Sequence, residues 1–294
     1  MGRRPVALRL IATSVIVAAL LSGCVGGEDN GRLHEQAAAA LARYADAVGA
    51  GAGPSGFQPA GELTGQVGNW EIAVGNNNKP ALMAGMLEAV EPLPSTPPAN
   101  GRITWSDGTS TSVPVLSAAA ALEQVRSTAT GSCPECSPLK VTGATLTSVS
   151  VSTNRGQATV PAWSFALDGT AVRVTRVAVA QTVEVVPPTW DPNHAPVGLS
   201  ISRATLAADG RTLTVSFVGA PDPASQPCGE DYAAEAVESD LAVVVIVHVH
   251  RNPVPAACTA VGAERIATVM LSNPLGSRAV LEVQEGLPVP VTRM

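Results

Sequence analysis

Residues Leu241 to His250 read Leu-Ala-Val-Val-Val-Ile-Val-His-Val-His, and this stretch decides the fold. Its apolar part, Leu241–Val247, has the length of a strand and is too short to cross a membrane. A short apolar run bounded by polar segments is typical of a buried strand. We therefore expect Leu241–His250 to be the central strand of a β-rich domain.

Further strand signals lie on both sides of this stretch. They are short, and turn residues such as Asp209-Gly210 and Pro274-Leu275-Gly276 separate them. Several short strands divided by turns predict a sandwich. We expect a β-sandwich-like domain over residues 197–294, preceded by a Pro-rich linker at residues 188–196. Its other expected strands are Gly198–Ala207, Leu213–Val218, Arg265–Leu271 and Ala279–Val283.

The middle of the chain mixes strand and helix patterns, which predicts an α+β domain over residues 60–187. An Asp107-Gly108 pair favours a tight hairpin turn. Ser117 is a plausible N-cap for a helix over Ser117–Ser127. A turn at Asn76-Asn77-Asn78 is expected between the first two strands. The expected strands are Gly61–Val74, Gly85–Val90, Arg102–Trp105, Thr109–Val113, Leu139–Val151, Ala158–Leu167 and Ala171–Val186.

The first 23 residues have the features of a signal peptide. Arg3, Arg4 and Arg9 precede a short apolar run, Leu10–Leu21, which is too short for a transmembrane helix. Leu-Ser-Gly-Cys follows, with the cysteine at position 24. Small residues before a cysteine match the lipobox of bacterial lipoproteins, in which the thiol accepts a diacylglyceryl group. We therefore expect cleavage before Cys24 and lipidation of its thiol.

This N-terminus predicts an address for the protein. The acyl chains of a lipidated Cys24 would hold the mature chain on the extracytoplasmic face of the cell membrane. Residues 24–59 would form the lipidated segment: a polar tether at Val25–Gly31, a helix over Arg32–Val48 and a Gly/Pro-rich linker at Gly49–Pro59. The expected fold is mainly β, with two β-rich domains after a lipid-tethered N-terminal helix.

The charge balance restricts the possible partners. Without the three signal-peptide arginines, 15 Lys and Arg residues remain against 24 Asp and Glu residues, a formal net charge of −9. An acidic surface repels phosphate backbones, so we expect no nucleic-acid partner. Aromatic residues make up only 3% of the chain, which weakens a sugar-binding hypothesis. The membrane, reached through the lipid, is the one partner that we expect; any protein or small-molecule partner stays unknown.

Five cysteines are an odd number for an exported chain, and lipidation of Cys24 leaves four. An even set outside the cytoplasm predicts two disulfides. Three pairings are possible. We prefer Cys133–Cys136 and Cys228–Cys258, because each pair then stays inside one expected domain.

Two motifs have both a chemical and a structural interpretation. Cys133-Pro-Glu-Cys136 could be a redox pair, but that chemistry needs the first thiol near a helix N-terminus. Here the expected helix precedes the pair, which favours a structural disulfide. His248 and His250 share one side of a strand and could bind a metal, but no third ligand is evident. The acidic stretch from Glu230 to Asp240 is expected to be a solvated face.

Four segments resemble parts of uncharacterised actinobacterial secreted lipoproteins. The resemblance covers nearly the whole mature chain and implies an envelope location. It implies no activity, because it carries no assigned catalytic residues. The segments are Glu62-Leu-Thr-Gly-Gln66, Val160-Pro-Ala-Trp163, Ala236-Val-Glu-Ser-Asp-Leu241 and Gly286-Leu-Pro-Val-Pro-Val291.

These observations lead to one main hypothesis and two alternatives. We expect a lipid-anchored, non-enzymatic envelope protein that binds or displays an unknown ligand, with no catalytic residue, metal or cofactor. One alternative is an extracytoplasmic thiol–disulfide oxidoreductase using Cys133 and Cys136. The other is a carrier of small apolar ligands, which would need a deep apolar pocket.

Overall fold

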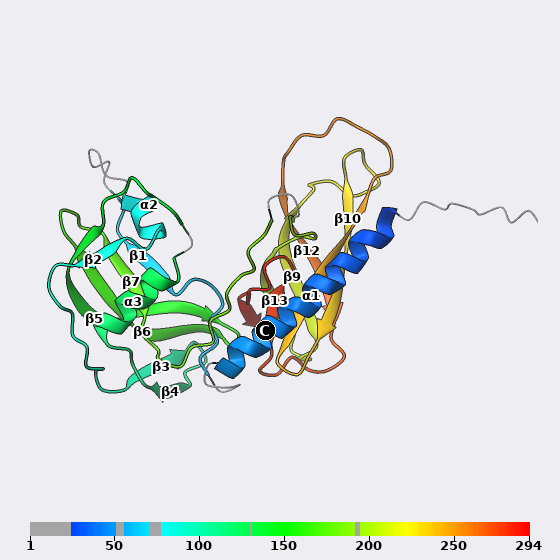
Figure 1. The fold of residues 1–294 in the computed structure, drawn as a ribbon. Helices are drawn as coiled ribbons and strands as arrows, with labels where there is room; N and C mark the ends of the chain where they lie inside the picture. The colour runs from blue at the N-terminus through cyan, green and yellow to red at the C-terminus, as the bar shows by residue number, and fades with distance from the viewer. Residues whose placement is uncertain (1–24, 51–55, 71–77, 130, 192–194) are drawn as a thin grey trace, which may run out of the picture.

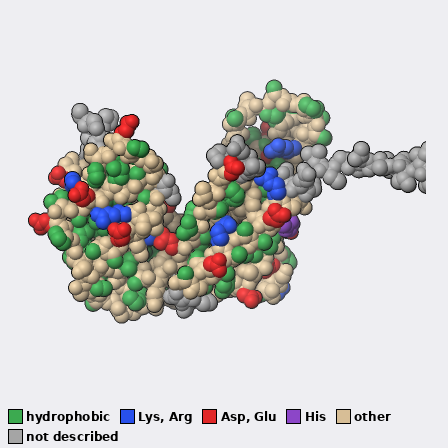
Figure 2. All heavy atoms as spheres, viewed as in Figure 1, with side chains coloured by type: hydrophobic (Ala, Val, Ile, Leu, Met, Phe, Trp, Pro, Cys, Tyr) green, Lys and Arg blue, Asp and Glu red, His purple; other side chains and the backbone are tan. Residues whose placement is uncertain are grey.

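The computed structural model describes residues 25–50, 56–70, 78–129, 131–191 and 195–294. Over these residues the protein is mainly β with a small helical part, as the sequence predicts, and its strands form three sheets. The strands fall into two groups, which we call the N-terminal sheet (β1–β7) and the C-terminal sandwich (β8–β14) (Figure 1). Figure 2 shows them as two lobes with a notch between them.

The C-terminal sandwich is built from a three-stranded and a four-stranded sheet. The first has the order β10-β11-β13 and the second the order β12-β9-β8-β14. Leu213, Val215 and Phe217 of β9 are buried in one core cluster with Val243, Val245 and Val247 of β11. The strands are β8 (Ile201–Leu206), β9 (Thr212–Gly219), β10 (Glu230–Glu238), β11 (Ala242–Arg251), β12 (Ala263–Met270), β13 (Ala279–Glu282) and β14 (Val291–Arg293).

The central strand β11 is buried on both faces. Val243, Val245 and Val247 pack into the sandwich, whereas Ala242, Val244 and Ile246 belong to a second cluster with the helix α1 (Val25–Ala50). Six consecutive residues of β11 are therefore buried. Because both faces are covered, the strand is continuously apolar rather than alternating. Burial on both faces therefore explains the uninterrupted apolar run in Leu241–His250.

Helix α1 lies diagonally across the sandwich (Figure 1). Its buried residues are spaced three or four positions apart and therefore share one side of the helix: Leu33, Ala37, Ala40, Tyr44 and Val48. The expectation of a polar tether at Val25–Gly31 is wrong, because the backbone is already helical from Val25. Once packing holds the middle of a helix, adding a turn at its end costs little compared with nucleation.

The N-terminal sheet has the order β1-β7-β6-β3-β4, and β5 pairs with both β6 and β2. Helix α3 packs against β7, and its N-cap is Ser117, as predicted: Ser117 Oγ accepts a hydrogen bond from Ala120 N. The elements are β1 (Thr64–Val67), α2 (Asn78–Met83), β2 (Leu87–Ala89), β3 (Gly101–Trp105), β4 (Ser110–Val113), α3 (Ala118–Ser127), β5 (Leu139–Thr153), β6 (Gly156–Leu167) and β7 (Arg173–Val177).

Two expectations for this sheet need correction. Within the described part of the strand expected at Gly61–Val74, regular pairing covers Thr64 to Val67, and Gly68, at φ 91°, follows its end; residues 71–74 lie outside the described residues. A helix begins at Asn78, where a turn was expected; Asn76 and Asn77 lie outside the described residues. β1 pairs with β7, whereas β2 pairs in parallel with β5. The first two strands, β1 and β2, are therefore not neighbours in the sheet.

The long strand expected at Ala171–Val186 is also wrong in length. Regular pairing covers β7 only, and beyond it single bridges join Val179 to Val115 and Thr182 to Phe57. Beyond β7 the backbone no longer pairs with β6 and β1, and it bridges instead to Val115 and then to Phe57. This exchange brings residues 183–187 out of the sheet and towards the sandwich.

Candidate functional site

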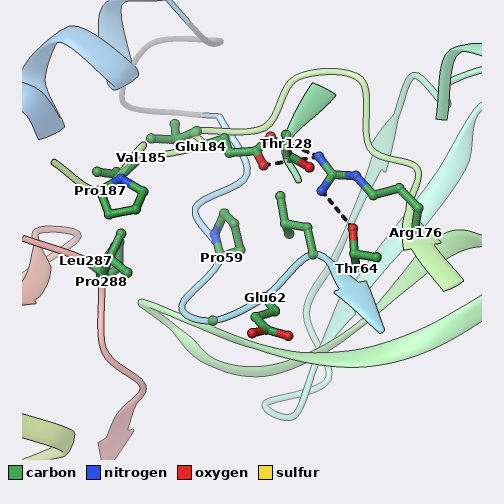
Figure 3. Close-up of a pocket in the computed structure, with 13 residues that line it drawn as sticks. Pro59, Glu62, Thr64, Thr128, Arg176, Glu184, Val185, Pro187, Leu287 and Pro288 are labelled. Atoms are coloured by element: carbon green, nitrogen blue, oxygen red, sulfur yellow. Dashed lines mark hydrogen bonds and ion pairs between the residues drawn. The ribbon is translucent and has the colours of Figure 1, made fainter. Parts of the chain in front are cut away.

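A cleft lies where the N-terminal sheet meets the sandwich (Figure 3). Its volume is about 340 Å³. Residues 59–64 and the segment 183–187 form one side, and Leu287 and Pro288 of the sandwich close the other. Ligand sites occur preferentially at such junctions, because two rigid bodies meet there and leave a concave surface.

Arg176 is the charged anchor of this cleft. Its side chain is only 3% exposed, and Nη2 lies 2.9 Å from Oε2 of Glu184. Arg176 Nη1 donates to Thr64 Oγ1 at 3.2 Å, and Nε and Nη2 donate to Gln124 Oε1 at 3.3 and 3.2 Å. Burial of a guanidinium costs free energy unless its donors are satisfied, and here three side chains satisfy them. Arg176 therefore fixes the segment at Glu184 against β1 and α3.

The junction cleft continues along the first strand of the sheet. A second hollow of about 510 Å³ shares Glu62, Thr64 and Thr128 with it. Its walls are β1, the end of α3 and the exposed surface of α2, where Lys79, Leu82 and Met83 lie. We call the two hollows together the junction groove. Its length favours an elongated ligand over a compact one.

The free charges of the junction groove are few. Glu62 and Lys79 line it and are exposed, whereas Arg176 and Glu184 neutralise each other. The Glu62 carboxylate lies apart from that ion pair (Figure 3). The remaining walls are apolar or uncharged. Such a surface can hold a ligand by contact and by a few hydrogen bonds, and it gathers no acid–base pair for proton transfer.

None of the four described cysteines lines this groove. The structure pairs Cys133 with Cys136 and Cys228 with Cys258, at Cα–Cα distances of 5.4 and 5.6 Å. Cys136 is buried in the core beneath α3, and the pair follows the C-terminal end of that helix. The helix N-terminus that a reactive thiol needs is therefore not at this pair. Cys24 and the signal peptide lie outside the described residues.

Two of the described histidines, His34 and His248, have a partner that the sequence did not indicate. Glu235 Oε2 lies 2.8 Å from Nε2 of His248, and Glu235 Oε1 lies 3.5 Å from Nε2 of His34 on α1. Nothing in the sequence indicates the contact of His34, because no local pattern places the helix on β10. Within the described part of the chain, no three potential ligand side chains are arranged to hold a metal ion.

The acidic stretch before Leu241 is the strand β10, which pairs antiparallel with β11. Its glutamates are partnered rather than merely solvated. Glu230 lies 2.8 Å from Arg251, and Glu238 lies 2.7 Å from Arg278. Burial alone would raise the pKa of Glu238, but the Ser272 N–H and the Arg278 guanidinium together lower it. Ion pairs near both ends of β10 therefore add to its backbone pairing with β11.

Sequence reasoning missed the junction groove completely. Its residues come from positions as far apart as Pro59 and Pro288, and no chemical motif marks them, although two of the segments singled out above, Glu62–Gln66 and Gly286–Val291, supply part of the lining. A further signal was the arginine at position 176, inside a predicted strand that is otherwise rich in valine and alanine. Fold and site together define a mainly-β protein with a ligand-sized groove between a sheet and a sandwich. No family model matches the chain, and no match was found among curated proteins or solved structures.

Proposed function

We propose that this protein is a lipid-anchored, non-enzymatic binding protein on the extracytoplasmic face of the membrane, and that its ligand lies in the junction groove. The observation that carries the binding part is the groove itself: two hollows of about 340 and 510 Å³ that share three residues. The anchoring part rests on the Leu-Ser-Gly-Cys sequence that ends at Cys24. No helix of the described residues is long and apolar enough to cross a membrane.

The chemistry of the groove supports a ligand that is elongated and largely uncharged. The arginine is already neutralised by Glu184, which leaves little attraction for a free anion. The groove is open along its length, so the ligand is not enclosed as it would be in a deep apolar cavity. This geometry favours display of a bound segment at the surface over transport of a small apolar molecule.

The binding part is tested by photo-crosslinking in cells. A photoreactive amino acid at Thr128, which is exposed and lines both hollows, should form a specific adduct. The same residue at Thr292, exposed on β14 outside the groove, is the matched control. Glu62→Lys should weaken the Thr128 adduct without changing the Thr292 background. Equal adducts at both positions would overturn the proposed site.

The anchoring part is tested separately by fractionation. Cys24→Ala should abolish retention in the membrane fraction, and globomycin should block cleavage of the parent chain. If the variant is still cleaved and still sediments with membranes, the lipid anchor is wrong. The groove would then remain open to the crosslinking test, because the two results do not depend on each other.

A further inference from the structure

The strand β5 presents a long free edge. On one side it pairs with β6 from Val141 to Thr153. On the other side β2 reaches only to Val141, and Ala60 N donates to Ser152 O at the far end. Between these contacts, residues 143–151 have no backbone partner on that side within the described chain.

The backbone groups on this edge can be identified. The Ser152 carbonyl points away from β6, since it accepts from Ala60. Ser148 lies opposite Pro161, which has no N–H, so this pair is not hydrogen-bonded to β6. In an antiparallel ladder such residues alternate. The N–H and C=O groups of four residues therefore point to the free side: Ala144, Leu146, Ser148 and Ser150.

Over residues 144–151, and within the described chain, this edge has none of the features that keep edge strands apart; the register shift in β5 lies before it, between Val141 and Gly143. Residues 141–153 contain no charged residue and no proline, in a chain whose formal net charge is −6. Residues 145–148 are all exposed, and Leu146 is 41% exposed. Natural proteins protect long edges with charges, prolines, bulges or a covering element. An unprotected edge of this length is suited to pairing with another strand, because only an extended backbone matches its donors and acceptors.

We propose that β5 pairs antiparallel with β5 of a second copy, with Thr147 opposite Thr147 of that copy. The identical segment is uncharged, so a second copy brings no repulsion to the contact. A two-fold axis through Thr147 places Leu146 opposite Ser148 and Ala144 opposite Ser150. All four residues with free groups then meet each other in hydrogen-bonded pairs, and the two sheets continue across the axis.

Disulfide trapping tests the register. The full chain carrying Thr147→Cys, in its own membrane, should form a disulfide-linked homodimer on mild oxidation. Thr145→Cys is the matched control, since in this register Thr145 lies opposite Val149 and the two introduced cysteines are about 13 Å apart. We expect at least about tenfold more dimer from Thr147→Cys, because cysteines so far apart cannot be bridged. Peptide mass spectrometry should identify the 147–147 link.

A second variant tests the hydrogen bonds. Ser148→Pro removes an N–H from the free edge and leaves the pairing with β6 intact, whereas Ser148→Ala keeps that N–H. In the Thr147→Cys background, Ser148→Pro should abolish the crosslink and Ser148→Ala should preserve it. A crosslink that survives Ser148→Pro in a folded protein, or an equal one from Thr145→Cys, overturns the proposal. So does a Thr147→Cys adduct with a different protein, which would mean that another strand occupies the edge.

Discussion

Asn154 and Ser277, which are 123 positions apart in the chain, are joined by a hydrogen bond from Asn154 Nδ2 to the Ser277 carbonyl at 2.8 Å. Asn154 Nδ2 also donates to Gln58 Oε1 at 2.7 Å, and the same oxygen accepts from the Tyr44 hydroxyl at 2.8 Å. The β5–β6 turn, the segment after α1 and the sandwich therefore meet in one buried polar network. Burial of the hydroxyl raises the pKa of Tyr44, which keeps it a donor at any physiological pH.

Asn154→Ala should lower the free energy of unfolding by about 1–3 kcal/mol, since it leaves buried acceptors unsatisfied. Urea unfolding measures the loss. Gln58→Ala removes the shared acceptor, so the double variant should cost less than the sum of the single ones by at least about 0.5 kcal/mol. Additive losses would mean that the network does not act as a unit. The control is Asn252→Ala. It removes a hydrogen bond from Asn252 Nδ2 to the Ala224 carbonyl, which lies within the sandwich and outside this network.

Gly286→Ala should loosen α1 from the sandwich. Gly286 has φ 70°, and an added Cβ would lie 2.7 Å from Ala40 Cβ on the helix. Gly210 has a similar φ of 69° but its nearest neighbour would lie at 3.9 Å, so Gly210→Ala measures backbone strain alone. We expect Gly286→Ala to cost about 1–3 kcal/mol more than Gly210→Ala. Faster amide hydrogen exchange confined to α1 in Gly286→Ala would show that the helix is loosened. Equal losses of unfolding free energy in Gly286→Ala and Gly210→Ala would contradict the prediction.

The Cys228–Cys258 bridge should stabilise the protein more than the Cys133–Cys136 bridge. Cys228 and Cys258 are 30 positions apart in the chain, whereas Cys133 and Cys136 are 3 positions apart. Closing the longer loop removes about 3–4 kcal/mol of chain entropy from the unfolded state, against about 2 kcal/mol for the shorter one. Urea midpoints of the two double cysteine-to-alanine variants measure the difference. A greater loss at the short bridge would show that packing of Cys136 in the core outweighs loop entropy.

Asp209 should contribute stability that is lost only in strong acid. Hydrogen bonds from the Thr212 side chain and from the Thr212 and Arg211 N–H groups lower the pKa of Asp209 from 3.8 to about 2. A depressed pKa in the folded state stabilises it above the unfolded value, so this contribution is complete above pH 3.8 and disappears as the pH falls through about 2. NMR titration should show this value, and Thr212→Val should move it back towards 3.8. An unchanged pKa in Thr212→Val would contradict the assigned cause.

Much of the fold follows from local sequence. The hairpin at Asp107-Gly108, the N-cap at Ser117 and the turn between β5 and β6 were all predicted, because each depends on residues that are near neighbours in the chain. The predictions fail where the pairing of a segment depends on residues that are distant in the chain. Residues beyond Val177 look like one strand, yet the chain changes neighbours there, and no local pattern records which strand lies alongside.

The sequence by itself determined the β-rich class and the buried strand at Leu241–His250, since periodicity and turn residues are properties of the chain. It also favoured the cysteine pairing, because each pair stays inside one expected domain. Only the tertiary structure decided that α1 covers β11, that Glu235 meets both His34 and His248, and that residues near 60, 185 and 287 form one groove. Apart from the contact between Glu235 and His248 on neighbouring strands, these contacts join segments more than 100 positions apart. They depend on how whole sheets and helices pack, and pairwise residue preferences are too weak to specify that from one sequence.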